Sequence, residues 1–174
     1  MNKLSKITKT AVIATLYVLL TYVSASFGLA YLPVQLRASE SLCVLPVFMP
    51  EAVFGLTLGC FVSNLTSPFG VIDVLFGTLA TCLSAVFSRI FKDVTLKKMP
   101  LLSLSFPVLI NALIIGAEIS FFNTGGFTFR TFVPVCVSIM ISEFLACYGL
   151  GLALFFVLKR GKFFERFVAL NYKQ

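Results

Sequence analysis

The stretch that decides the fold is residues 40–66, ESLCVLPVFMPEAVFGLTLGCFVSNLT. It is mostly apolar but is interrupted at Met49-Pro50-Glu51. Proline is disfavoured inside a helix, because it lacks a backbone N–H group, but it is common in the first turn. The stretch therefore predicts two short helices, 40–49 and 51–66. Ten helical residues rise about 15 Å, half of a hydrocarbon core, so the first helix either extends into the preceding loop or lies inside a bundle.

Longer apolar segments lie on both sides of this stretch. The first, 7–27, is longer than the apolar region of a signal peptide, about 7–15 residues, and we interpret it as an uncleaved first span. Further segments are long enough to cross a bilayer at 68–91, 101–122 and 131–158. The sequence thus predicts an all-α integral membrane protein, with six transmembrane helices in a single domain, 1–174.

The basic residues indicate how often the chain crosses the membrane. With six crossings and a cytoplasmic N-terminus, only Arg37 and Arg130 lie outside. The other twelve lie inside: Lys3, Lys6, Lys9, Arg89, Lys92, Lys97, Lys98, Lys159, Arg160, Lys162, Arg166 and Lys173. A single crossing by residues 40–66 would move the middle cluster outside and remove the asymmetry that is typical of membrane proteins. Six crossings with both termini in the cytoplasm are therefore favoured.

The composition argues against several classes of protein. Hydrophobic residues make up 59% of the chain and charged residues only 12%, about half the charged share of an average soluble domain. The net charge is +7, and the basic residues lie in short clusters between apolar runs. This placement is typical of the flanks of membrane spans and does not indicate nucleic-acid binding. The chain has no histidine and no phosphate-binding loop, and its five cysteines, in apolar runs, are interpreted as packing residues. We therefore expect no metal, no cofactor and no enzyme activity, with an intramembrane enzyme or a scaffold as alternatives.

Polar residues within the predicted spans gather in the outer half of the membrane. Asn111 and Glu143 lie nearer the middle, and only Glu51 lies towards the inner side. The residues near the outer ends are Arg37, Glu40, Asn64, Asp73, Glu118 and Arg130. Ionisable groups are costly in a bilayer and usually face the bundle interior. This distribution favours a polar pocket open to the outside, because a continuous pore would need polar lining in both halves.

Simpler structural roles remain open for several of these residues. Arg37 and Glu40 are three residues apart and could form a salt bridge at a helix start. Asp73 lies in a first helical turn, where a carboxylate interacts favourably with the helix dipole. Glu118 could pair with Arg130 across the short outer loop. Small residues could serve either internal packing or docking of another membrane protein, in Gly55-x-x-x-Gly59, Thr10/Ala14 and Ala11/Thr15.

A set of motifs between Val34 and Thr81 resembles a known family. The motifs are VQLRASESL at 34–42, Leu45-Pro46, FMPEA at 48–52, Gly55, LGC at 58–60, Asn64-Leu65, SPFG at 67–70 and DVLFGTLAT at 73–81. They resemble the QueT family, the queuosine-precursor substrate-binding (S) components of energy-coupling-factor (ECF) transporters, and the resemblance extends over nearly the whole chain. It implies a six-helix S component in a bacterial plasma membrane. An S component for another small heterocyclic vitamin is the nearest alternative.

The resemblance also implies partners and roles for the site residues. An S component captures its substrate outside, docks on a transmembrane coupling protein (T component) with two cytoplasmic ATPases, and topples to release the substrate inward. Queuosine precursors are deazaguanine bases, whose ring N–H and exocyclic amine suit one carboxylate. Glu143 or Glu118 would bind this edge beside Asn111. Arg37, Glu40, Asn64 and Asp73 would form the rim and gate, and Thr10, Ala11, Ala14 and Thr15 would form the docking face.

Overall fold

The computed structural model describes residues 3–29, 36–124 and 126–160, and within them the chain is helical with one isolated β-bridge between Leu96 and Met99. The elements are α1 (Lys3–Ser26), η1 (Ala38–Val44), α2 (Leu45–Phe48), α3 (Glu51–Asn64), α4 (Val71–Ile90), α5 (Leu101–Thr124), α6 (Phe129–Phe144), η2 (Leu145–Gly151) and α7 (Leu152–Arg160). Part of the predicted outer loop, 30–35, and the basic tail from 161 onward lie outside the described residues.

Four helical stretches are long and apolar enough to cross a membrane, which confirms an all-helical, multi-pass membrane protein. They are Leu4–Ser26, Val71–Ile90, Leu101–Phe122 and Phe129–Arg160. Their bounds lie within a few residues of the predicted spans. The last stretch is one continuous run in which η2, a π-helical segment, separates α6 from α7. Large apolar side chains are exposed along these helices, as expected where lipid is the solvent.

The predicted break between the two short helices is confirmed at Met49-Pro50. Met49 is extended, with φ −145° and ψ 137°, and Pro50 is the N-cap residue of α3. A residue before proline avoids the helical conformation for steric reasons, so the break follows from local chemistry. The first short helix differs from the prediction, since Ala38–Val44 forms a 3-10 helix and only Leu45–Phe48 is α-helical. A 3-10 helix rises about 2.0 Å per residue, more than the 1.5 Å of an α-helix, so it covers more depth.

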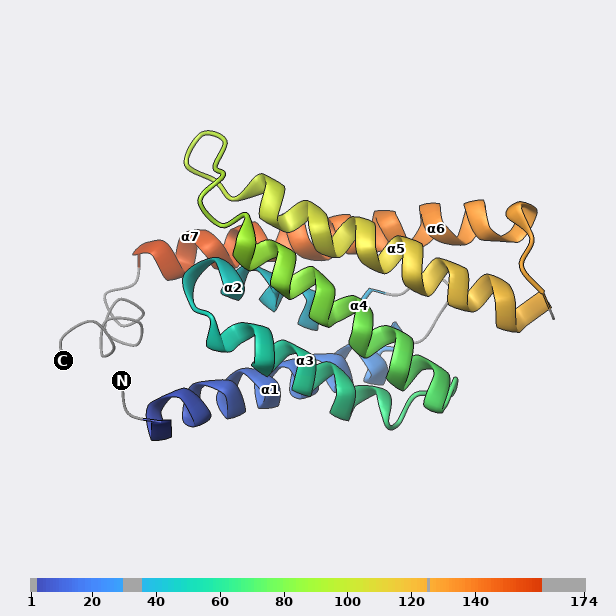
Figure 1. The fold of residues 1–174 in the computed structure, drawn as a ribbon, viewed down its shortest axis with the longest axis horizontal. Coiled ribbons are helices and arrows are strands. Elements are labelled where there is room, and N and C mark those ends of the chain that lie inside the picture. Colours follow the sequence, from blue (N-terminus) through green and yellow to red (C-terminus); the bar gives the residue numbers. More distant parts are fainter. Residues whose placement is uncertain (1–2, 30–35, 125, 161–174) are drawn as a thin grey trace.

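The short segment from Ala38 to Phe48 lies inside the bundle. Ser39 through Val44 are all buried, as are Leu45 and Pro46. Around it, α3 packs between α1 and α4, and α5 packs between α4 and α6 (Figure 1). The 3-10 segment also contacts η2 and α1. The second of the two placements left open by the sequence, inside the bundle, is therefore the observed one.

The GxxxG motif of α3 forms the seam with α1. A Cβ atom added at Gly55 would lie 2.7 Å from Cβ of Ile13, and one added at Gly59 would lie 2.7 Å from Cβ of Tyr17 and 2.9 Å from the carbonyl oxygen of Ala14. No side chain fits at such distances, so the two glycines permit this close approach of the helix backbones. Of the two roles considered for this motif, internal packing is the one that the structure shows.

The connections between helices alternate between the two ends of the bundle. The start of α1, the α4–α5 connection and the end of α7 lie at one end, on the left in Figure 1. The α3–α4 and α5–α6 connections lie at the other end, on the right. This arrangement brings the start of α4 and the end of α5 to the same side of the molecule.

Candidate functional site

Most of the polar residues predicted from the sequence meet around one cavity in the interior. Its polar and charged lining consists of Arg37, Glu40, Thr81, Asn111 and Glu143. Gly77 from α4, Ile115 from α5 and Ile139 from α6 complete the wall. These residues come from η1 and its N-cap position and from α4, α5 and α6. Four of the seven predicted substrate-binding residues therefore share one cavity.

Arg37 is held at the N-cap position of η1 by two other predicted residues. Its Nη2 lies 3.5 Å from Oδ2 of Asp73, and its Nη1 donates to Oδ1 of Asn64 at 3.2 Å. Asn64 in turn donates from Nδ2 to the backbone carbonyl of Asp73 at 3.0 Å. The observed ion pair is therefore with Asp73, 36 positions along the chain, and not the helix-start pair with Glu40 that the sequence left open. The three side chains join η1, the end of α3 and the start of α4.

Gly77 makes room for this cluster on α4. A Cβ atom at Gly77 would collide with the amide nitrogen of Asn64 and lie 3.2 Å from Oδ1 of Asp73. Any side chain at this position would therefore displace the amide or the carboxylate from its partners.

Glu40 accepts hydrogen bonds from residues that the sequence did not single out. The hydroxyl of Tyr17, fully buried on α1, donates to Oε1, and the Cys43 thiol donates to Oε2 at 3.1 Å. The Cys147 thiol lies 3.6 Å from the backbone carbonyl oxygen of Glu40. A tyrosine in an apolar helix is a weak signal, because tyrosine also occurs at membrane interfaces. The buried cysteines are free thiols that pack and donate weakly, as predicted.

Glu143 and Asn111 form the second half of the site. Nδ2 of Asn111 donates to Oε1 of Glu143 at 2.9 Å, so these two predicted residues are direct partners across α5 and α6. The Cys147 thiol lies 3.8 Å from Oε2 of Glu143. The π-helical segment η2 begins two residues after Glu143. Such wide turns are frequent at functional sites, and this one places Cys147 beneath the carboxylate.

The cluster contains more carboxylates than cations. Arg37 is paired with Asp73, while Glu40 and Glu143 also face the cavity that Arg37 lines. Ionised carboxylates buried without counter-ions are strongly unfavourable. A ligand that presents N–H donors or a positive charge would therefore be complementary to this cavity.

The cavity is narrow in this conformation. Its volume is about 10 Å³ for the centre of a water-sized molecule, which is room for about one water. The apolar side chains of Ile115 and Ile139 line the cavity beside the Asn111–Glu143 pair and belong to one packed cluster. A ring-shaped ligand could therefore enter only if the elements that line the cavity move apart.

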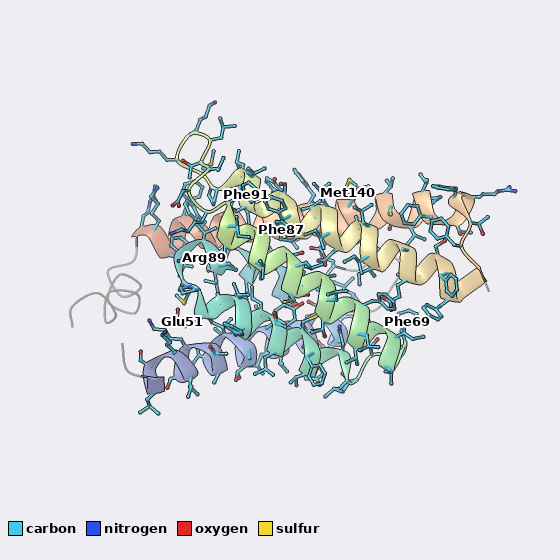
Figure 2. The ribbon with its side chains drawn as sticks, viewed as in Figure 1. Glu51, Phe69, Phe87, Arg89, Phe91 and Met140 are labelled. Carbon is cyan, nitrogen blue, oxygen red and sulfur yellow. The ribbon has the colours of Figure 1, made fainter. Side chains whose placement is uncertain are left out.

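Glu118, a predicted binding residue, and the polar residues Arg130 and Glu51 belong neither to this cavity nor to the Arg37 cluster. Glu118 is buried on α5 one turn beyond Ile115, but it lines a different groove, on the side of α4 and α5. Arg130 is exposed, and no ion pair joins it to Glu118 in the part of the chain that the structure describes. Glu51 lies at the opposite end of the bundle from Phe69, near Arg89 (Figure 2).

Arg89 has a structural role that charge counting did not reveal. Its Nη1 donates to the backbone carbonyls of Pro46 at 3.1 Å and Val47 at 3.3 Å. These carbonyls belong to α2, a single helical turn whose C-terminal acceptors have no partner within the helix. Arg89 therefore stabilises the C-terminal end of the short buried segment.

The Arg37–Asp73 pair gives a direct test of how the cluster is held together. Asp73→Asn leaves a buried guanidinium without its counter-ion, and we expect the free energy of unfolding to fall by about 3 kcal/mol or more. Asp93→Asn is the matched control, because the exposed Asp93 carboxylate lies 3.9 Å from Lys92, and we expect no measurable change there. Unfolding of both variants in mixed micelles by a denaturing detergent measures the difference. Equal stability of the two variants would contradict the assigned pair.

Comparison with known proteins identifies the family. A family model described as "QueT transporter" matches residues 7–160. The curated "Queuosine precursor transporter QueT" of Lactococcus lactis subsp. cremoris (strain MG1363) is 36% identical over 80 residues, which cover 46% of this chain and 47% of that protein. No solved structure matches the chain. The family that the motifs predicted is confirmed: this chain belongs to the QueT transporter family.

Proposed function

We propose that this protein is the substrate-binding (S) component of an ECF importer and captures a queuosine precursor, a deazaguanine base, from outside the cell. The observation that carries the proposal is the buried Glu143–Asn111 pair beside a cavity that also contains Glu40 and Arg37. The name of the Lactococcus relative supports the substrate class. The excess of carboxylates in the cavity supports a ligand that is rich in N–H donors.

Glu143 is the proposed reader of the base. Its carboxylate would accept the ring N–H and the exocyclic amine of the base as a pair of charge-assisted hydrogen bonds. Asn111 would turn its amide from Glu143 to the neighbouring base carbonyl. Of the two carboxylates left open by the sequence, Glu143 is favoured over Glu118, because Asn111 contacts Glu143 directly and only Glu143 lines the cavity beside it. Ile115 and Ile139, which line the cavity from one packed cluster, would contact the flat ring.

The cluster of Arg37, Asn64 and Asp73 is proposed as the gate. It joins the start of η1 to the end of α3 and the start of α4, at the end of the bundle where these helices connect. Separation of these elements would widen the narrow cavity enough for a base. Glu40 would remain tied to Tyr17 of α1 and would couple this movement to the first helix.

The proposed topology has six crossings of a bacterial plasma membrane, with both termini in the cytoplasm. The alternation of helix connections between the two ends of the bundle supports it (Figure 1). The basic loop between α4 and α5 lies at the same end as the start of α1 and the end of α7, as the positive-inside pattern requires. In this topology the proposed gate, the cluster of Arg37, Asn64 and Asp73, faces outside. The T component and its two ATPases would supply the energy for transport.

The base-reading role predicts how carboxylate variants bind. In a titration of the purified protein with a deazaguanine precursor, we expect Glu143→Gln to weaken binding by about tenfold or more, because a charge-assisted hydrogen bond contributes about 1.5–3 kcal/mol. Glu118→Gln should weaken it less, since Glu118 lies outside the cavity.

Glu51→Gln is the matched control, because Glu51 is also a buried carboxylate but lies at the other end of the bundle. Its affinity should equal that of the wild type. If folded Glu143→Gln bound the precursor with wild-type affinity, the proposed role of Glu143 in recognising the base would be wrong.

The first helix carries the proposed docking face, and its four predicted residues differ in how far they are exposed. Ala14 is buried against Gly59, and the hydroxyl of Thr10 lies 3.5 Å from the carbonyl oxygen of Glu51. Ala11 and Thr15 are exposed on the outer surface of α1. Ala11 also lines an apolar groove between α1 and α3, of about 520 Å³, together with Ile7, Phe54 and Leu58. We therefore assign docking to Ala11 and Thr15 and internal packing to Ala14, while Thr10, which is half-buried, contacts Glu51 and also lines this groove.

A bulky substitution separates docking from packing. Ala11→Leu should reduce co-purification with the T component and its ATPases by severalfold, because close helix contacts in membranes depend on small residues. Ala153→Leu, at an exposed alanine of α7, is the control and should not reduce this co-purification. Both variants should bind substrate as the wild type does. Undiminished association of Ala11→Leu would show that this face does not dock.

A further inference from the structure

One face of α1 carries a row of hydroxyl groups that is buried against the short segment η1. Tyr17, Thr21 and Ser24 are spaced four and three residues apart, so they lie on the same face of the helix. Tyr17 and Thr21 are fully buried, and Ser24 is 5% exposed. Burying a hydroxyl among apolar groups is costly unless it is hydrogen-bonded. The partners of this row therefore indicate what α1 holds in place.

Two of the hydroxyls hold the start of η1. The side-chain oxygens of Thr21 and Ser39 lie 2.9 Å apart, and Ser39 is fully buried. The backbone N–H of Ala38 donates to Oγ of Ser24 at 2.9 Å. Ala38 is the first residue of η1, and the first N–H groups of a helix have no acceptor within it. Ser24 therefore supplies an acceptor that the helix start lacks.

The third hydroxyl, that of Tyr17, reaches the lining of the cavity. It donates to Oε1 of Glu40, while Oε2 accepts from the Cys43 thiol within η1. The position of Tyr17 is fixed by the seam between α1 and α3, because a Cβ atom at Gly59 would lie 2.7 Å from Cβ of Tyr17. The orientation of the Glu40 carboxylate therefore depends on α1.

The carboxylate on α6 is held without help from α1. Glu143 accepts a hydrogen bond from Asn111 of α5, and no hydrogen bond joins it to α1 among the described residues. Likewise, the described part of the chain shows no hydrogen bond or ion pair from the side chains of Ser39 and Glu40 to α4, α5 or α6. The cavity therefore lies between two carboxylates that are held by separate sets of helices.

We propose that Tyr17 is a positioning residue of the substrate site, which holds the Glu40 carboxylate towards the ligand, and that Thr21 and Ser24 fasten η1 to α1 as one unit. This inference rests on the proposed function, in which the cavity receives a deazaguanine base. Tyr17 is fully buried and does not line the cavity, so it acts through Glu40 and does not touch the ligand.

The same link connects the proposed docking face to the cavity. Ala11 and Thr15 are exposed, whereas the hydroxyl row is buried on another face of the same helix. Because η1 is hydrogen-bonded to α1, a shift of α1 against a partner would carry Glu40 with it. Glu143 would stay with α5 and α6, so the two carboxylates would move apart and loosen their hold on a ligand.

Hydrogen exchange of the whole protein in micelles, followed by mass spectrometry of its peptides, tests the fastening without any ligand. We expect Tyr17→Phe and Thr21→Val each to speed amide exchange across η1 by about three- to tenfold, since each removes a buried hydrogen bond. Exchange across α5 should not change. Tyr148→Phe is the matched control, because its hydroxyl donates to the carbonyl oxygen of Leu101 at 2.8 Å, and it should leave η1 as protected as in the wild type. Unchanged exchange across η1 in both test variants would overturn the proposal.

Titration with a deazaguanine precursor tests the positioning role. We expect Tyr17→Phe to weaken binding about three- to tenfold and Tyr148→Phe to leave it unchanged. In a Glu40→Ala background, Tyr17→Phe should have little further effect, because the carboxylate through which it acts is gone. An equal loss in both backgrounds, or wild-type affinity in folded Tyr17→Phe, would overturn this role.

The two measurements also separate this inference from the proposed function. If the wild type bound no deazaguanine, the proposed function would fail, and the exchange measurement would still decide whether α1 holds η1. If Glu40→Ala did not fold, the comparison of Tyr17→Phe with Tyr148→Phe in the otherwise wild-type protein would decide the positioning role.

Discussion

The constraint on which the whole structure depends is that charges buried in a membrane must find their partners inside the protein. Arg37, Asp73 and Asn64 meet this constraint together, by an ion pair and two hydrogen bonds that join three separate elements. The short segment from Ala38 to Phe48 is placed by it, because Arg37 is fixed just before its start and Arg89 binds the carbonyls near its C-terminal end. A helix too short to span lipid alone is thus held between two arginines.

The same segment explains why the site lies where it does. Because η1 occupies the interior, Glu40 does not face lipid. It lines the same cavity as Glu143 and Asn111. The surrounding helices approach closely where glycine permits it, at Gly55 and Gly59 against α1 and at Gly77 beside Asn64 and Asp73. The glycines therefore have two roles. Gly55 and Gly59 allow α1 and α3 to pack closely, and Gly77 leaves space for the contacts of Asn64 and Asp73. Glu118 does not line this cavity and lies on the side of α4 and α5.

Local chemistry made some of this predictable and long-range packing made the rest unpredictable. The break at Met49-Pro50 follows from proline alone, and the long spans follow from apolar length. The gathering of Arg37, Glu40, Asn111 and Glu143 followed from the cost of burying polar groups in lipid. The partner of Arg37 could not be foreseen, because helix spacing favoured Glu40 while the fold brings Asp73 closer. Tyr17 was missed because a tyrosine in an apolar helix has several common roles, and the 3-10 form of η1 depends on neighbours distant in sequence.

The central claim is that the buried cavity holds a deazaguanine base. The most direct measurement is purification of the protein from its native membrane, followed by mass spectrometry of the small molecules released on denaturation. The account predicts a queuosine precursor from the wild type, and its loss from Glu143→Gln purified in the same way. Release of an unrelated vitamin, or equal retention of the precursor by the variant, would contradict it.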